Sequence, residues 1–152
     1  MCNPTLFNTR IEIDIRLTKE EANLILQKFD DSSDTPLHIG LNFDSYSEKL
    51  SQFANFILYH QNDKLLGFVA YYLNKEELFI YIPQIIVHKD GRHLGIGHQM
   101  LNELQKRKKT YYNCILLEVL KNNENAIMFY KREGFQMIKD NGERWLLRKN
   151  LK

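Results

Sequence analysis

The feature that most constrains this chain is a glycine-rich turn between an apolar strand and an amphipathic helix. The predicted strand ends in Ile85-Ile86-Val87, and the turn with the start of the helix runs from His88 to Gly97. A helix start carries unpaired backbone N–H groups and the positive end of the helix dipole, and glycine lets an anion approach because no Cβ intervenes. The segment therefore predicts a phosphate-binding turn within an α/β fold.

Composition predicts a single domain over residues 1–152, because 43% hydrophobic and 26% charged residues suit one packed core. The formal net charge of +2 is too small to require a polyanionic partner. The two cysteines, Cys2 and Cys114, predict no disulfide framework, which favours a reducing, cytoplasmic compartment. Neither a secretory signal pattern nor an apolar run of membrane-spanning length is present, so we expect a soluble protein.

Hydrophobic periodicity and turn signals predict alternating strands and helices. Thr18 with Glu21 forms a capping box that opens the first helix, and its Ala22, Leu24, Ile25 and Phe29 are expected to face the core. The segment 37–44 is either a pocket-shaping loop or a plain connector. In chain order we expect a strand over 10–17, helices over 18–29 and 45–53, strands over 56–60, 65–73 and 78–87, a helix over 94–108, a strand over 114–120, a helix over 123–133, and strands over 135–138 and 144–148.

Three local features refine these predictions. Pro83 marks an irregularity in an otherwise central strand, because proline cannot donate to a β-ladder. An apolar or small stripe at helical spacing is expected to face the core from Leu94, Gly97, Met100, Leu101 and Leu104. The basic run Lys106–Lys109 is interpreted as the solvated end of this helix, and a nucleic-acid patch is the alternative.

Two blocks of residues resemble the GNAT superfamily of N-acetyltransferases. The first is Arg92-His93-Leu94-Gly95-Ile96-Gly97, placed after a strand that ends in Val87. The second follows a strand and consists of Asn123, Ala126, Phe129, Tyr130, Gly134 and Phe135 at the family's spacing. The family often has proline at position 89 and glycine at position 93, where this chain has Lys89 and His93.

The resemblance implies a mixed α/β fold, with a central, mostly antiparallel sheet of about six to seven strands and helices on both faces. It also implies acetyl-CoA (coenzyme A) as the cofactor. The diphosphate would lie on the backbone amides between Arg92 and Gly97, and the pantetheine arm would pair with the strand near Ile85–Val87. Asn123 would contact the cofactor, although an N-cap role explains it equally well. The implied cofactor-binding residues are Ile85, Ile86, Val87, Arg92, His93, Leu94, Gly95, Ile96, Gly97, His98, Asn123 and Tyr130.

Acetyl transfer to an amine needs a neutral nucleophile and a proton for the departing thiolate. Tyr130 occupies the position of the family's acid, and the alternative is a buried ring that only packs. Glu118 is the candidate base, and a structural carboxylate is the alternative. His60 and His88 are weaker candidates, and we predict no metal site. Aromatic candidates for an acceptor pocket, or for a packed core, are Tyr46, Tyr59, Tyr72, Tyr81 and Trp145.

The sequence thus predicts an acetyl-CoA-dependent N-acetyltransferase. It would act on a primary amine of a small molecule or peptide by direct attack in a ternary complex. The alternative is a catalytically inactive acyl-CoA-binding sensor or interaction module. We expect neither a nucleic-acid partner nor a membrane partner, and we expect a monomer or homodimer.

Overall fold

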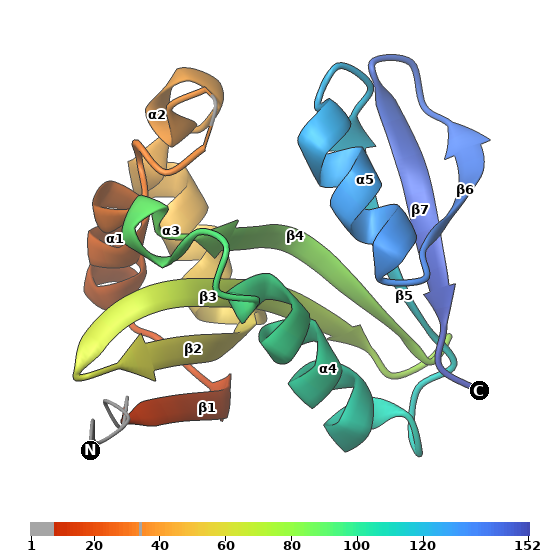
Figure 1. The fold of residues 1–152 in the computed structure, drawn as a ribbon, viewed down its shortest axis with the longest axis horizontal. Coiled ribbons are helices and arrows are strands. Elements are labelled where there is room, and N and C mark those ends of the chain that lie inside the picture. The colour runs from red at the N-terminus through yellow and green to blue at the C-terminus, as the bar shows by residue number, and fades with distance from the viewer. Residues whose placement is uncertain (1–7, 34) are drawn as a thin grey trace, which may run out of the picture. The chain divides into compact units, whose positions relative to one another are not determined.

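The computed structural model describes residues 8–33 and 35–152, so Cys2 lies outside the described residues. Figure 1 labels the helices and strands. In chain order they are β1 (Thr9–Ile15), α1 (Lys19–Lys28), α2 (Leu37–Gly40), α3 (Phe43–Phe53), β2 (Asn55–Gln61), β3 (Lys64–Asn74), β4 (Phe79–Val87), the 3₁₀ turn η1 (Lys89–Gly91), α4 (Ile96–Lys108), β5 (Cys114–Leu120), α5 (Glu124–Arg132), β6 (Gln136–Asp140) and β7 (Arg144–Asn150).

The strands form one seven-stranded sheet in the order β1-β2-β3-β4-β5-β7-β6. β1 pairs antiparallel with β2, and β7 pairs antiparallel with both β5 and β6. β4 and β5 pair in parallel, which requires a crossover connection, and α4 supplies it. The predicted mixed, mostly antiparallel sheet of six to seven strands is confirmed.

The chain divides into two compact units. The first contains the residues up to Ala70 together with Gln84–Leu101, and the second contains Tyr71–Pro83 together with Asn102–Lys152. Strands β3 and β4 and helix α4 each continue from one unit into the other. A single domain spanning residues 1–152 stays a prediction.

Helices cover both faces of β3 in the first unit. Phe68 packs edge-on against Phe29 of α1, with ring centroids 5.0 Å apart. The preceding residue, Gly67, faces the opposite side of the sheet. A Cβ on Gly67 would lie 2.9 Å from Cγ2 of Ile96 and 3.0 Å from Cε of Met100 in α4. Glycine at position 67 therefore permits the close approach of α4 to the sheet.

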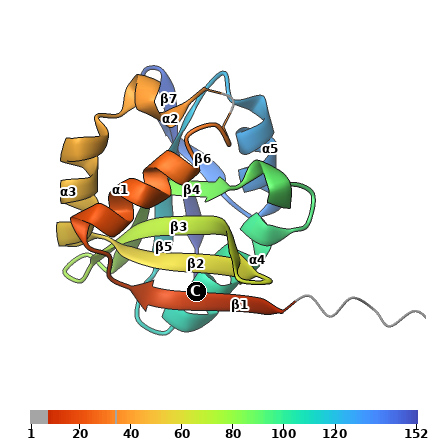
Figure 2. The same ribbon diagram turned by 90° about the vertical axis from the view of Figure 1, so that its left-hand side faces the viewer.

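The β2–β3 hairpin turns on Asn62 and Asp63, which both have left-handed backbones with φ of 52° and 65°. Two such residues in a row are typical of the tight hairpin turn that matches strand twist. Strands β1, β2 and β3 lie side by side in the views of Figures 1 and 2. The two strands predicted over 56–60 and 65–73 are confirmed.

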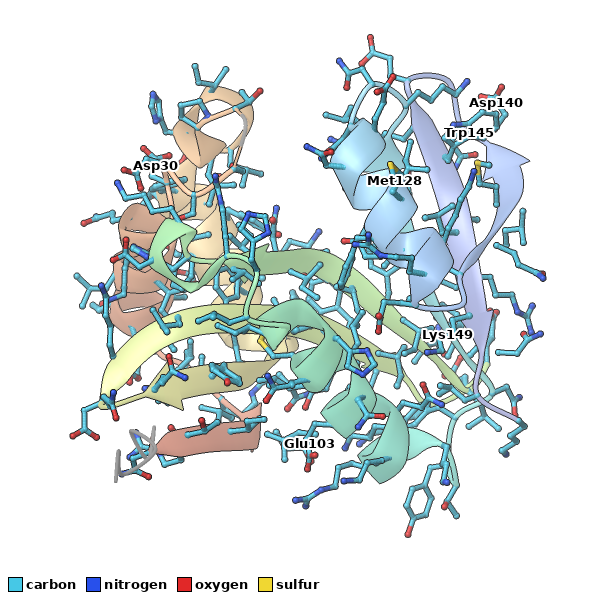
Figure 3. All side chains as sticks on the ribbon, in the orientation of Figure 1. Asp30, Glu103, Met128, Asp140, Trp145 and Lys149 are labelled. Carbon is cyan, nitrogen blue, oxygen red and sulfur yellow. The ribbon has the colours of Figure 1, made fainter. Side chains whose placement is uncertain are left out.

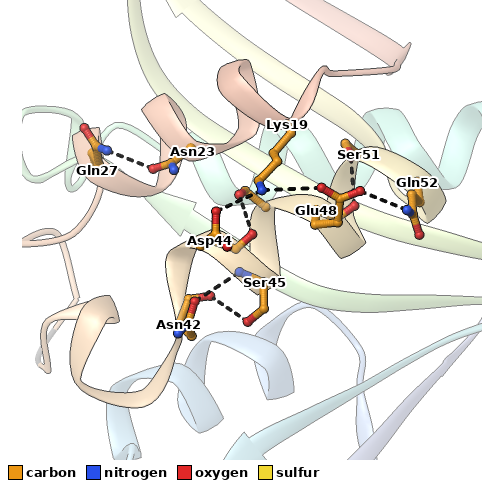
Figure 4. A network of polar contacts seen from close by, with 10 residues as sticks. Lys19, Asn23, Gln27, Asn42, Asp44, Ser45, Glu48, Ser51 and Gln52 are labelled. Carbon is orange, nitrogen blue, oxygen red and sulfur yellow. Dashed lines mark hydrogen bonds and ion pairs between the residues drawn. The ribbon is translucent and has the colours of Figure 1, made fainter.

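Polar contacts join the first helix to the third, as Figure 4 shows. The ammonium of Lys19 lies 2.8 Å from a carboxylate oxygen of Asp44 and 3.5 Å from one of Glu48. The hydrogen bond to Asp44 raises the pKa of Lys19. The predicted capping box is present, because Glu21 N donates to Thr18 Oγ1 at 3.1 Å and Thr18 N donates to Glu21 Oε1 at 3.0 Å.

The second unit is organised around β5, which pairs with β7 from Cys114 to Leu120. Alternate residues of these strands are buried on one face, including Leu117, Val119 and Leu147. At the end of β5, Lys121 lies 4.4 Å from the ring centroid of Trp145 and 2.6 Å from Oδ1 of Asp140. Figure 3 shows Trp145 on β7 beside Asp140 on β6. This contact ties the three strands together.

Two predictions about the core are wrong. Leu24 is 64% exposed, because the buried stripe of α1 runs through Ala22, Ile25 and Leu26 at helical spacing and leaves position 24 on the opposite side. Leu94 is 52% exposed and precedes α4, which begins at Ile96.

Residues 37–44 are expected to form a pocket-shaping loop or a plain connector, but Leu37–Gly40 forms the short helix α2. Asp30 holds it against the end of α1, since its Oδ1 accepts from His38 N at 2.8 Å and its Oδ2 lies 2.8 Å from His38 Nδ1. The hydrogen bond from the His38 backbone is the main cause that lowers the pKa of Asp30. The contacts between Asp30 and His38 thus hold α2 in place, and hydrophobic periodicity does not reveal such contacts.

Candidate active site

In the first unit, His88 begins the turn after β4. Its backbone N–H donates to the carbonyl of Leu66 at 2.8 Å, and its Nδ1 accepts from Asp90 N at 3.2 Å. Desolvation by burial lowers the pKa of His88, and the ring packs edge-on against Phe29. A neutral imidazole whose Nδ1 is an acceptor therefore caps the turn, which is a structural role.

Side chains on either side of the turn brace it. Lys89 Nζ lies 2.7 Å from Asp31 Oδ2, and Arg92 Nη2 donates to the carbonyl of Ser32 at 2.7 Å. Lys64 and Asp90 form a further ion pair and hydrogen bond. Arg92 thus braces the turn against the segment that follows α1, and any direct charge contribution to a cofactor stays a prediction.

The turn enters α4 through two left-handed residues, His93 with φ of 66° and Gly95 with φ of 73°. A left-handed backbone favours glycine, which accounts for the glycine that the resembled family often carries at position 93. A Cβ placed on Gly95 would meet nothing within 4 Å. The backbone at this point is open on the side where a side chain would project.

The helical ladder of α4 begins with Gln99 N donating to the carbonyl of Gly95 at 3.0 Å. The amides of Ile96 and Gly97 precede this bond, at the positive end of the helix dipole. Ile96 itself is buried, and a Cβ on Gly91 would lie 2.7 Å from its Cδ1. Close packing therefore fixes the helix start, and the arrangement suits an anion such as a diphosphate.

The predicted strand residues upstream of the turn lie in β4. Ile86 is buried, whereas Ile85 and Val87 are half-buried. His93, Leu94 and His98 are exposed. The pairing of a pantetheine arm with residues 85–87, and cofactor contacts at His93, Leu94 and His98, stay predictions.

In the second unit, the parallel ladder of β4 with β5 is short. Among the described residues its register runs from Phe79 opposite Cys114 to Tyr81 opposite Leu116. Pro83 lies two residues beyond the last pair and has no N–H to donate. The pairing of β4 with β5 therefore ends before Pro83, where the sequence predicts an irregularity.

Glu118 on β5 accepts a hydrogen bond from a tyrosine on the neighbouring strand. Tyr81 Oη lies 3.3 Å from Glu118 Oε1, and both side chains are half-buried. Burial, followed by the negative charge of Glu118, raises the pKa of Tyr81 to about 12. The phenol therefore stays protonated at neutral pH and donates to the carboxylate.

Helix α5 carries the other two predicted site residues of the second unit. Asn123 caps it, because its Oδ1 accepts from Ala126 N at 3.2 Å. The amide nitrogen of the Asn123 side chain still has two N–H donors, so capping and cofactor contact are compatible. Gly134, with φ of 94°, follows the C-cap residue Glu133 and ends the helix.

Tyr130 lies on the buried side of α5 and is 8% exposed. Its ring packs edge-on against Phe129 and Phe135, with centroids 5.3 and 5.5 Å away. Burial raises the pKa of Tyr130, so the phenol is protonated and able to serve as a proton donor. The ring is also packed, so the geometry agrees with both interpretations of the sequence.

Sequence reasoning assigned no role to the Tyr81–Glu118 contact and named Tyr81 only among aromatic candidates. The contact depends on the parallel register that places Tyr81 opposite Leu116, two residues before Glu118. The spacing of residues in the sequence does not show which residues of two paired strands lie opposite each other.

Other predictions concern charge and metals. Glu103 lies 3.6 Å from Lys106 Nζ and 3.0 Å from Arg107 Nε, so part of the basic run is paired within its own helix.

Within residues 8–33 and 35–152, no group of three or more His, Cys, Asp or Glu side chains could hold a metal ion. In the same described part of the chain, no helix has the length and apolar character needed to cross a bilayer.

Comparison with known proteins agrees with this geometry. Residues 21–135 match the model of the Acetyltransferase (GNAT) family, and the chain belongs to this family. Over 94 residues it is 32% identical to a protein named probable spermine N(1)-acetyltransferase from Bacillus subtilis subsp. natto (strain BEST195). That match covers 57% of this chain and 59% of the relative, so the chain spans less than two thirds of the relative's length.

Solved structures show the same fold. A protein from Pyrococcus horikoshii OT3 matches with a TM-score of 0.76 and 21% identity, covering 94% of this chain and 98% of that one. The PaiA N-acetyltransferase from Thermoplasma acidophilum, solved in complex with coenzyme A, matches with a TM-score of 0.73 and 19% identity, covering 93% and 99%. The expected GNAT fold is confirmed.

Proposed function

We propose that this protein transfers the acetyl group of acetyl-CoA to a primary amine of a small molecule or peptide, by direct attack in a ternary complex. The observation that carries the proposal is the start of α4, where the amides of Ile96 and Gly97 and the open backbone of Gly95 suit a diphosphate. Membership of the Acetyltransferase (GNAT) family supports the same reaction class.

The residues of the turn fit an acyl-CoA. The space that a Cβ of residue 95 would occupy is open, so a phosphate can approach the backbone of Gly95 without meeting a side chain. The bracing contacts of Lys89 and Arg92 hold the turn in place before any ligand binds. Preorganised amides lose little conformational freedom on binding, which favours affinity. Acetyl-CoA supplies a thioester, an acyl group already activated for transfer.

Two side chains of the second unit are proposed to move protons. An alkyl amine with an ordinary pKa of about 10.4 is mostly charged at neutral pH, so a base must remove its proton. Glu118 is the proposed base, and it presents a second carboxylate oxygen besides the one that faces Tyr81. Tyr130 is the proposed acid, because its raised pKa keeps a proton on the hydroxyl for the departing sulfur.

The name of a relative, rather than geometry, guides the choice of acceptor to test. That relative carries the name of a probable spermine acetyltransferase, so polyamines are the first amines to test. A cytoplasmic location is proposed with this function, since the only cysteine among the described residues, Cys114, is a buried free thiol.

The alternative is a module that binds acyl-CoA without catalysis. It is tested together with the proposed function by one experiment, in which acetyl-CoA is mixed with the purified protein and a broad panel of amines. Thiol release that depends on protein and amine supports the enzyme. Calorimetric binding of acetyl-CoA without thiol release across the panel supports the module, and the absence of binding at high micromolar acetyl-CoA contradicts both.

A further inference from the structure

We propose that Tyr81 is the positioning residue for Glu118, holding one carboxylate oxygen so that the other faces the acceptor amine. This inference rests on the proposed function, because it assumes that Glu118 accepts the amine's proton. The structural basis is the hydrogen bond from Tyr81 Oη to Glu118 Oε1 at 3.3 Å.

Strand register places the two side chains on one face of the sheet. Tyr81 pairs with Leu116, and Glu118 follows Leu116 by two residues, so all three point to the same side. Because both residues come from paired strands, the contact joins two backbones that the sheet already fixes. A glutamate in this position keeps fewer side-chain conformations than one that faces solvent.

Other side chains of the second unit lie near this pair. On β7, Arg144 and Arg148 lie two residues on either side of Leu146, which pairs with Glu118. The charge of Arg144 lowers the pKa of Tyr81 and Tyr72 raises it, whereas burial raises the pKa of Tyr72. Both phenols therefore stay protonated at neutral pH, and Tyr81 can donate to Glu118.

Replacing Tyr81 by phenylalanine removes the hydroxyl that donates to Glu118 Oε1, so the carboxylate gains conformational freedom. In Tyr81→Phe we expect kcat to fall about tenfold, with the KM for acetyl-CoA unchanged.

The test is a double-mutant cycle of Tyr81→Phe and Glu118→Gln, measured by steady-state kinetics with acetyl-CoA and an accepted amine at neutral pH. Tyr112→Phe is the matched control, because Tyr112 is a buried tyrosine of the same unit. If Tyr81 acts only through Glu118, Tyr81→Phe has no further effect in the Glu118→Gln background.

Two outcomes overturn the proposal while leaving the proposed function intact. One is an unchanged kcat in Tyr81→Phe, and the other is a loss that multiplies with that of Glu118→Gln. Thermal melting of each variant checks folding. The ¹³C chemical shift of the Glu118 carboxylate follows the contact without turnover, and the same chemical shift in wild type and Tyr81→Phe also contradicts the proposal. Failure of the wild-type protein to acetylate any amine would instead overturn the proposed function and this role with it.

Discussion

Replacing Gly95 by aspartate places a carboxylate where the diphosphate of acetyl-CoA is expected. A Cβ at this position meets nothing within 4 Å. The backbone is left-handed, with φ of 73°, and most residues other than glycine, asparagine and aspartate cost roughly 1–2 kcal/mol of stability there. Asparagine has the same shape without the charge and tolerates this backbone, so Gly95→Asn is the matched control.

The difference between the two variants isolates the charge. Two unit charges about 4 Å apart interact by roughly 1 kcal/mol in water and roughly 4 kcal/mol near a protein surface. For a repulsion of about 2 kcal/mol, Gly95→Asp should bind acetyl-CoA roughly 30-fold more weakly than Gly95→Asn. Ionic strength screens an exposed pair, so the difference should shrink as salt is raised.

Isothermal titration calorimetry with acetyl-CoA at low and high salt measures both effects. Melting temperatures of the two variants confirm that they carry similar backbone strain. Equal dissociation constants for Gly95→Asp and Gly95→Asn at low salt would refute the reasoning, because they would mean that no phosphate approaches Gly95.

Three further predictions concern the acid, the close packing of α4 and the buried imidazole. Tyr130→Phe keeps the edge-on ring packing and should lower kcat about 100-fold, more than it lowers acetyl-CoA affinity, and steady-state kinetics with an unchanged kcat would remove Tyr130 from the mechanism. Gly67→Ala should lower the free energy of unfolding by about 1–3 kcal/mol, because its Cβ meets Ile96 at 2.9 Å. Gly40→Ala, with nothing within 4 Å, should be neutral or stabilising in the same urea titrations. Burial lowers the pKa of His88 in the folded protein, so on acidification the imidazole is protonated first in the unfolded chain. The stabilising contribution of the neutral His88 should therefore be lost as pH falls below about 6.5. The wild-type protein should then lose more stability than His88→Asn between pH 7.5 and pH 5.5, and equal losses would show that His88 is not held neutral.

Local signals in the sequence predict most of the fold. The capping box at Thr18 acts within a few residues and forms as expected. The tight turn at Asn62 and Asp63 lies between two strands that the sequence predicts, and Gly134 follows the last predicted helix. Leu24 and Leu94 are predicted to face the core because they are apolar residues within predicted helices. Leu24 lies on the outer side of its helix, and Leu94 lies in the turn before α4. Apolar character and an approximate helix range do not separate these positions from buried ones.

The turn into α4 could be predicted from the local path of the chain, as at Gly95 before the helix and at Gly97 in its first turn. The candidate site was not predictable where it depends on contacts between distant segments. The brace from Arg92 to Ser32 joins two loops, and the hydrogen bond from Tyr81 to Glu118 follows from strand register. Both contacts require the pairing of elements far apart in sequence, which periodicity does not specify.

The most direct test of the central claim is a titration of ¹⁵N-labelled protein with coenzyme A, followed through backbone amide resonances. We expect the amides of Gly95, Ile96 and Gly97 to shift together and to saturate at one equivalent, because they precede the first hydrogen bond of α4. Binding of coenzyme A that leaves these three amides unmoved would contradict the proposal that the start of α4 holds the diphosphate.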